Sequence, residues 1–197
     1  MNDVQIIAVG ASLGGLAAVQ TLLGGLPAEL GVGVVIVQHR RPDPDSRLSW
    51  LLSRASALPI VEPEDRTPLE RNHVYLAPCD YHLLVEDGML ALSIDEPVRF
   101  ARPSIDVLFE SVADAYGPTA VGVMLTSSSA DGAEGLRAIK RAGGRAYVQD
   151  PATAESPVGP LAALAATPVD AVLKLEQIAP VLVQLCGAAG ARRITAV

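Results

Sequence analysis

The sequence has few of the residues that bind nucleic acids or anionic membranes. Only 4% of its 197 residues are aromatic, and 15 Lys and Arg stand against 22 Asp and Glu, which gives a formal net charge of −7. Nucleic acids and anionic lipids are bound through basic surface, and single-stranded bases stack on aromatic side chains. The composition therefore argues against a nucleic acid partner.

Cysteine and histidine are also scarce. Two cysteines, Cys79 and Cys186, form no disulfide framework, and neither they nor His73 and His82 have the spacing of a metal site. The sequence lacks the pattern of a signal peptide and any apolar run long enough to span a bilayer. We expect a reduced cytoplasmic protein that neither inserts into a membrane nor needs a metal or organic cofactor.

Apolar segments, by contrast, are abundant, since half of the residues are hydrophobic. Strand-like runs alternate with helix-like segments, and the clearest strands are residues 4–9, 32–37, 120–125 and 145–148. This alternation is typical of βαβ units. It predicts a single domain over residues 1–197 with a three-layer α/β/α architecture and a doubly wound, mainly parallel sheet.

The middle of the sequence departs from this alternation. Short strand candidates occur at residues 58–61, 73–76, 82–85 and 89–92, and Glu86-Asp87-Gly88 is a hairpin signal between the last two. We therefore expect a short antiparallel region. Ser46 and Ser104 are predicted N-caps of helices. Further helices are expected near residues 16–23, 133–141, 156–166 and 175–186.

The turn after the first strand, residues 10–14, reads Gly-Ala-Ser-Leu-Gly and fits the G-x-S-x-G nucleophile elbow. A dinucleotide site is disfavoured because the glycines stand at 10, 14 and 15, and no acidic residue ends the second strand. On this short pattern alone, a strand-helix turn with glycines for close packing remains an equal interpretation.

Three strand ends bring the residue types of acyl transfer to one edge of the predicted sheet: Ser12, His39 and Asp131. A histidine can take the proton of a serine nucleophile, and a carboxylate can orient the histidine. The order Ser, His, Asp disfavours the α/β-hydrolase fold, in which the acid precedes the histidine. His39 could instead be structural, and Asp131 could cap the helix that follows it.

Other polar residues near these strand ends are interpreted as structural. Ser127 to Ser129 are expected to form a loop rather than a second nucleophile, because no other histidine follows a strand nearby. Asp106 and Asp150 are expected in caps or turns, and His73 and His82 at strand ends or on the surface.

Six blocks, at residues 10–15, 35–39, 75–82, 102–111, 125–136 and 149–154, occur in the order seen in one family. From about Ile6 to Ile178 the chain resembles the catalytic domain of chemotaxis protein-glutamate methylesterases of the CheB type. The resemblance implies a cytoplasmic serine esterase of α/β/α fold. Its substrates would be methyl-esterified glutamates on the helical cytoplasmic part of methyl-accepting chemoreceptors, and it could also deamidate receptor glutamines.

The resemblance also implies roles for residues. Ser12 matches the nucleophile, His39 the base and Asp131 the orienting acid, while the backbone N–H groups of Leu13 and Ser128 match the oxyanion hole. Serines at 127–129 replace the family's Gly-Met-Gly, and serine tolerates positive φ poorly, so we expect a displaced second donor. A catalytically weakened receptor-binding or scaffolding module is therefore the alternative.

Two further expectations concern control and recognition. The first strand begins at about residue 4, which leaves no room for the N-terminal receiver domain that family members often carry, so we expect either a stand-alone domain or a fragment of a longer protein. Because the chain is acidic, long-range charge should not attract acidic receptor helices. Recognition is expected in a local groove near the carboxyl ends of the strands.

Overall fold

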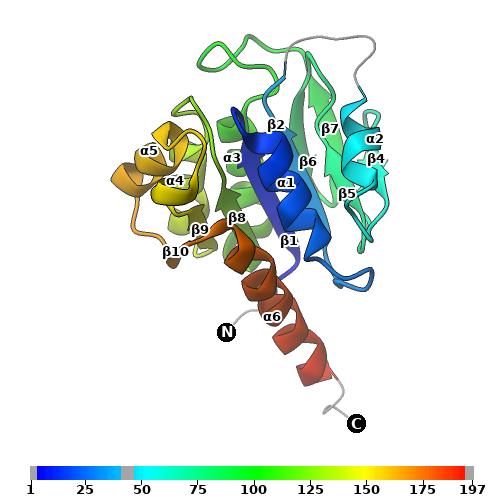
Figure 1. Ribbon diagram of the computed structural model, residues 1–197. Helices are drawn as coiled ribbons and strands as arrows, with labels where there is room; N and C mark the ends of the chain where they lie inside the picture. Colours follow the sequence, from blue (N-terminus) through cyan, green and yellow to red (C-terminus); the bar gives the residue numbers. More distant parts are fainter. Residues whose placement is uncertain (1–3, 41–46, 194–197) are drawn as a thin grey trace.

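The computed structural model describes residues 4–40 and 47–193, with side chains through residue 187. Its main sheet has seven parallel strands in the order β10-β9-β8-β1-β2-β5-β3 (Figure 1). The strands are β1 (Ile6–Ala11), β2 (Gly33–Gln38), β3 (Ile60–Val61), β5 (Val74–Leu76), β8 (Ala120–Met124), β9 (Arg145–Gln149) and β10 (Ala171–Leu173).

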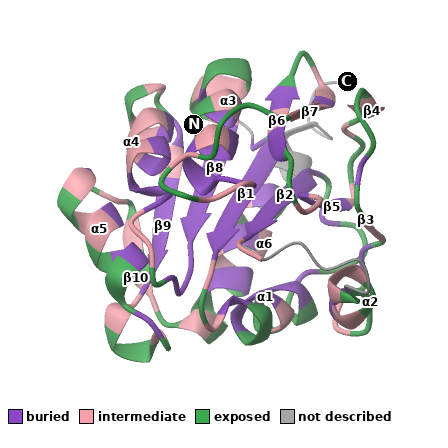
Figure 2. Cartoon of the chain, turned by 90° about the horizontal axis from the view of Figure 1, so that it is seen from above, coloured by how far each residue is buried: buried purple, intermediate pink, exposed green. Residues whose placement is uncertain are grey.

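Helices cover both faces of this sheet (Figure 2). One layer consists of α1 (Gly15–Gly24), α2 (Leu48–Ser53) and α6 (Leu175–Arg193), the other of α3 (Ile105–Tyr116), α4 (Ala133–Arg141) and α5 (Val158–Ala166). Successive residues of β1 serve the two cores in turn, because strand side chains alternate between faces. Ile7 and Val9 belong to the core under α1, whereas Ile6 and Ala8 belong to the core under α3. The predicted three-layer α/β/α fold is confirmed.

A second, antiparallel sheet contains β4 (Thr67–Pro68), β7 (Met89–Ser93) and β6 (His82–Glu86), in that order. Strands β6 and β7 form the predicted hairpin, in which Glu86 pairs with Met89. Asp87 and Gly88 both have positive φ, which is the backbone conformation that an Asp-Gly hairpin turn favours.

Most of the remaining element predictions are confirmed within a few residues. Ser104 caps α3 as predicted, since its Oγ accepts a hydrogen bond from the Val107 N–H. Ser46, the other predicted cap, lies outside the described residues. Two 3₁₀ helices cover Gly117–Thr119 and Pro151–Thr153, and Asp150 caps the second with its side chain, which confirms its predicted role. In the part of the chain that the structure describes, no helix is long and apolar enough to cross a membrane.

The strand order places β1 at the centre of the functional edge. Neighbouring β2 and β8 pair with its two sides in parallel register. After β5 the chain forms the small sheet and α3 before it returns to the main sheet as β8, so the direction of winding reverses between β1 and β8. Ligands of open α/β sheets bind at the carboxyl ends of strands at such a reversal.

Candidate active site

Ser12 lies in a tight turn between β1 and α1. Its N–H donates to the Thr126 carbonyl at 3.0 Å, and its carbonyl accepts from the Gly15 N–H at 2.9 Å. Gly14 has φ +77°, and a Cβ there would lie 2.6 Å from the Cβ of Glu155. Glycine at 14 is therefore required by backbone conformation and by space. The turn holds Ser12 where the strand ends and the N–H groups of α1 begin.

His39 follows β2 directly beside this turn. The register pairs Ala11 with Gln38, and the His39 N–H donates to the Ala11 carbonyl at 2.9 Å. The two residues that follow this last pair, Ser12 and His39, therefore leave neighbouring strands side by side. The sequence prediction that they meet at one edge is confirmed at the level of the backbone.

Gln38 joins the two strand ends and was not predicted as a site residue. Its Nε2 donates to the Ser12 carbonyl at 2.8 Å and to the His39 carbonyl at 3.0 Å. The side chain is buried, and a Cβ on Gly15 would lie 1.9 Å from its Oε1. Gly15 thus leaves the space for Gln38. Its position immediately before His39 was the only signal in the sequence.

Asp131 holds the ring of His39. The His39 Nε2 and the Asp131 Oδ2 are 2.7 Å apart, and the carboxylate is fully buried. An ionised carboxylate only accepts, so it keeps the proton on Nε2 and leaves Nδ1 with the lone pair of a base. The two ring nitrogens thus have the reverse of their roles in the chymotrypsin-type triad, where the carboxylate holds Nδ1.

The N-terminus of α3 completes the surroundings of Asp131. The carboxylate accepts hydrogen bonds from the Ser104 Oγ at 2.8 Å, the Ile105 N–H at 2.7 Å and the Asp106 N–H at 3.0 Å. Burial alone would raise the pKa of Asp131, but the hydrogen bonds from His39, the α3 backbone and Ser104 outweigh it and lower the pKa. The alternative that Asp131 caps the following helix is wrong, because it binds the start of α3.

Asp106 caps that following helix instead. Its Oδ1 accepts from the N–H groups of Gly132 and Gly135, each at 2.8 Å, and its Oδ2 lies 3.4 Å from the Arg99 Nε. Burial raises the pKa of Asp106, and the charge of Asp131 adds to this, against the hydrogen bonds of Gly135 and Gly132 and the charge of Arg99. The predicted cap role is confirmed, although the helix is α4 rather than its own α3.

His82 was expected at a strand end or on the surface. It begins β6, which agrees with the strand-end position, but it is buried. Its Nδ1 accepts from the Ser104 N–H at 3.2 Å, so its Nε2 carries the proton that is donated to the Glu96 carbonyl. The ring of His73 bonds to the nearby Arg71 carbonyl and approaches Glu70. Among the described residues no group of three or more His, Cys, Asp or Glu could hold a metal ion.

The cleft beside Ser12 has a volume of about 690 Å³, which is within the usual range for small-molecule sites. It is lined by Ser12, His39, Gln38, Glu155, Leu13 and Ser128, together with residues 14–17 and Gln20. Neither the Leu13 N–H nor the Ser128 N–H makes a hydrogen bond within the described part of the chain. Two backbone donors are thus available beside the serine.

The loop of three serines, residues 127–129, is held by hydrogen bonds that its own hydroxyl groups make. None of Ser127, Ser128 and Ser129 has positive φ, so the steric objection to serine does not apply. The Ser127 Oγ donates to the Ser129 carbonyl and accepts from the Ser129 N–H, both at 3.1 Å, and the Ser129 Oγ accepts from the Asp131 N–H. These bonds hold the backbone between β8 and Asp131 without glycine.

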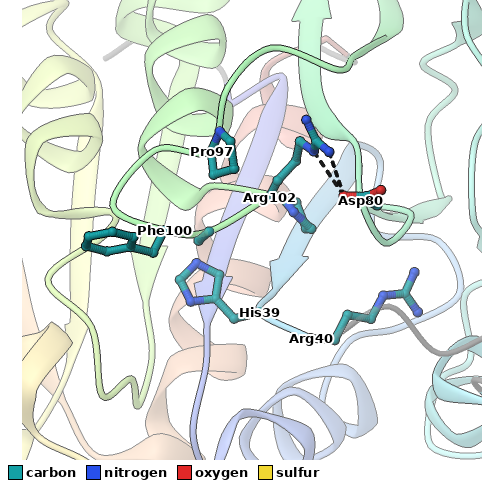
Figure 3. A pocket seen from close by; sticks show the side chains of 8 residues that line it. His39, Arg40, Asp80, Pro97, Phe100 and Arg102 are labelled. Atoms are coloured by element: carbon teal, nitrogen blue, oxygen red, sulfur yellow. Dashed lines mark hydrogen bonds and ion pairs between the residues drawn. The ribbon is translucent and has the colours of Figure 1, made fainter.

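A second cleft, of about 430 Å³, also borders His39 (Figure 3). Its lining residues are His39, Arg40, Asp80, Pro97, Phe100, Ala101, Arg102 and Pro103. Arg102 donates to the Asp80 carboxylate, with its Nη2 at 2.7 Å. His39 is therefore shared by both clefts.

Comparisons with known proteins find similar sequences and a similar fold. The family model described as CheB methylesterase matches residues 7–182. A putative protein-glutamate methylesterase/protein-glutamine glutaminase of Leptospira interrogans is 44% identical over 92% of this chain and 94% of its own length. A relative from Anaeromyxobacter dehalogenans with the same two activities in its name is 38% identical, but the chain spans only 53% of it. The crystal structure of the Thermotoga maritima CheB methylesterase catalytic domain matches with a TM-score of 0.88 and 27% identity, over 93% of this chain and 100% of that one.

Proposed function

The chain belongs to the CheB methylesterase family, and from this premise we propose that it is a serine hydrolase that demethylates glutamate methyl esters on the cytoplasmic helices of chemoreceptors. The same chemistry would deamidate receptor glutamines. The observation that carries the proposal is the 2.7 Å contact between His39 and the buried Asp131, at the strand edge where Ser12 follows β1.

In the first step, the Nδ1 of His39 takes the proton of the Ser12 hydroxyl as its oxygen attacks the ester carbonyl carbon. The ionised Asp131 stabilises the imidazolium that forms. The oxyanion is received by the N–H groups of Leu13 and Ser128. Each such donor typically contributes about 2.7–4 kcal/mol to transition-state stabilisation.

In the second step the tetrahedral intermediate collapses and the methoxy group leaves with the proton of His39 as methanol. A water molecule then gives a proton to His39 Nδ1 and attacks the glutamyl ester of Ser12. The C–O bond to Ser12 breaks, the serine oxygen regains its proton from His39, and a glutamate carboxylate is released. With a glutamine substrate, ammonia is the first leaving group.

The test is methanol release from a methylated chemoreceptor, compared between the wild-type protein and His39→Ala. The proposal expects release by the wild type and its loss in the variant, because a neutral serine is a poor nucleophile without a base. Folded wild-type protein that binds several methylated receptors but releases no methanol would contradict it, and would favour the scaffolding module.

A further inference from the structure

A four-residue turn, residues 98–101, has a backbone that its sequence does not favour. Val98 and Ala101 exchange two backbone hydrogen bonds, of 3.1 and 2.9 Å. The central residues Arg99 and Phe100 both have positive φ, 48° and 64°. Two-residue turns with two positive φ values strongly prefer Asn-Gly or Asp-Gly, because side chains with a Cβ are strained there. We name these four residues the Phe100 turn.

Packing within the protein does not compensate for this strain. Phe100 is fully exposed, at 104%, whereas Phe109, the other phenylalanine, is fully buried in the core under α3. The strained backbone conformation is unfavourable for folding, and so is the full exposure of a large apolar side chain to water. Such combinations cluster at sites where the strain serves binding or catalysis.

The location of Phe100 indicates what it binds. Its side chain lies at the cleft that shares His39 (Figure 3). The cleft of Ser12, which His39 also lines, is bordered by two exposed apolar side chains, Leu13 and Leu16. Exposed apolar groups therefore line both clefts that contain His39. A methoxy leaving group is far smaller than the 430 Å³ of the Phe100 cleft, so that cleft is available to another part of the substrate.

Three arginines lie at the Phe100 cleft, and each already contacts a carboxylate. Arg40 and Arg102 line it, and Arg99 stands in the turn itself, on a chain of net charge −7. Arg40 binds Glu62 and Arg102 binds Asp80, each with an Nη2 at 2.7 Å. Arg99 approaches Asp106. The cleft thus combines an apolar anchor with arginines whose charge is already paired.

We propose that the Phe100 turn docks the substrate helix. The occupant is an amphipathic chemoreceptor helix whose glutamyl ester lies at Ser12. Phe100 packs against an apolar side chain of that helix, one or two turns away from the ester. The inference rests on the proposed function and assigns part of substrate recognition to a turn outside the catalytic groups.

The test is Phe100→Gly, which suits the positive φ and removes the aromatic ring. We expect the melting temperature to stay the same or rise, and the KM for methylated receptor to rise at least tenfold with kcat changed less than threefold. Hydrolysis of N-acetylglutamate γ-methyl ester, which has no helix to dock, should be unchanged. Phe100→Leu should restore part of the affinity. Leu161→Ala in α5 is the matched control, since Leu161 is 53% exposed and lies far along the chain from the turn.

Two results would overturn the proposal. One is an unchanged KM for receptor in Phe100→Gly. The other is a loss of activity on N-acetylglutamate γ-methyl ester that equals the loss on receptor. A binding assay in the Ser12→Ala background separates docking from chemistry, because it needs no turnover. Phe100→Gly should weaken receptor binding at least tenfold there, and equal binding would overturn the docking role even if the wild type releases no methanol.

Discussion

Asp131 caps α3, the helix that contains Asp106, and Asp106 caps α4, the helix that follows Asp131. Asp131 stands just before α4 and accepts from the first N–H groups of α3, while Asp106 in the first turn of α3 accepts from the N–H groups of Gly132 and Gly135. Because α3 and α4 pack side by side, this exchange joins two helix N-termini to the catalytic edge (Figure 2). The carboxylate that binds His39 is therefore held in place by two helices that pack against each other.

The cap made by Asp106 predicts different effects for two substitutions. Asp106→Ala leaves two buried N–H groups of α4 unpaired and should lower the free energy of unfolding by about 2 kcal/mol. Asp106→Asn keeps the accepting Oδ1 and should lose much less. Urea unfolding of both variants at neutral pH measures this, and equal losses would contradict the cap.

The raised pKa of Asp106 adds a pH dependence to this comparison. A group with a raised folded pKa favours folding below its unfolded pKa of about 3.8, and that contribution is lost as pH rises through the folded pKa. An asparagine is neutral at every pH. The stability of Asp106→Asn relative to wild type should therefore improve as pH rises above 3.8, and a decline would refute the assignment.

Asp131 should have the opposite pH dependence, because its folded pKa is lowered. Its contribution to stability is present above the unfolded value of 3.8 and is lost as pH falls through the folded pKa, below 3.8. In Asp131→Asn the amide nitrogen must face a donor. The variant should thus be less stable than wild type by about 2–4 kcal/mol at neutral pH. Unfolding curves should show the stability difference between Asp131→Asn and wild type narrowing below pH 3.8. A difference that stays constant would argue against an ionised Asp131.

Gln38 is expected to position Ser12 and His39 without contributing much stability. Gln38→Met keeps the length of the side chain but removes both donated hydrogen bonds, so kcat should fall about 10- to 100-fold with little change in KM. The matched control is Gln20→Met in the same cleft, because Gln20 donates only to the Leu51 carbonyl. Equal kcat values for the two variants would remove Gln38 from the positioning role.

The oxyanion role proposed for Ser128 concerns its backbone N–H and not its hydroxyl. Ser128→Pro removes the N–H, and kcat should fall about 10²- to 10³-fold. Ser128→Met restores the family's side chain on the same backbone and should keep kcat near the wild-type value. Melting temperatures verify that both variants fold. A similar kcat in all three proteins would mean that the oxyanion is bound elsewhere.

The sequence predicted the part of the fold that rests on long apolar runs. Strands β1, β2 and β8 are buried on both faces, so their runs are nearly continuous, and their shared direction brings Ser12, His39 and Asp131 to one edge. Strands β4 and β10 have two and three residues, too few for any periodicity to show. Both were missed.

The hydrogen bonds between distant elements could not be predicted. Asp106 reaches Gly132 across 26 residues, and the donation from Gln38 to Ser12 also spans 26, so neither leaves a local pattern. The two tight turns with positive φ at both central residues also differ in whether the sequence predicts them. Asp87-Gly88 carries the usual residues of a tight hairpin and was predicted, whereas the Phe100 turn also has two successive positive φ values but lacks those residues.

The most direct test of the account is kcat for methanol release from methylated receptor in Ser12→Ala and Ser128→Ala. Both serines line the same cleft, but only Ser12 is proposed to attack the ester. We expect the rate of Ser12→Ala to fall to background while that of Ser128→Ala stays within about threefold of wild type, since its N–H remains. Undiminished release by Ser12→Ala would contradict the assignment of the nucleophile.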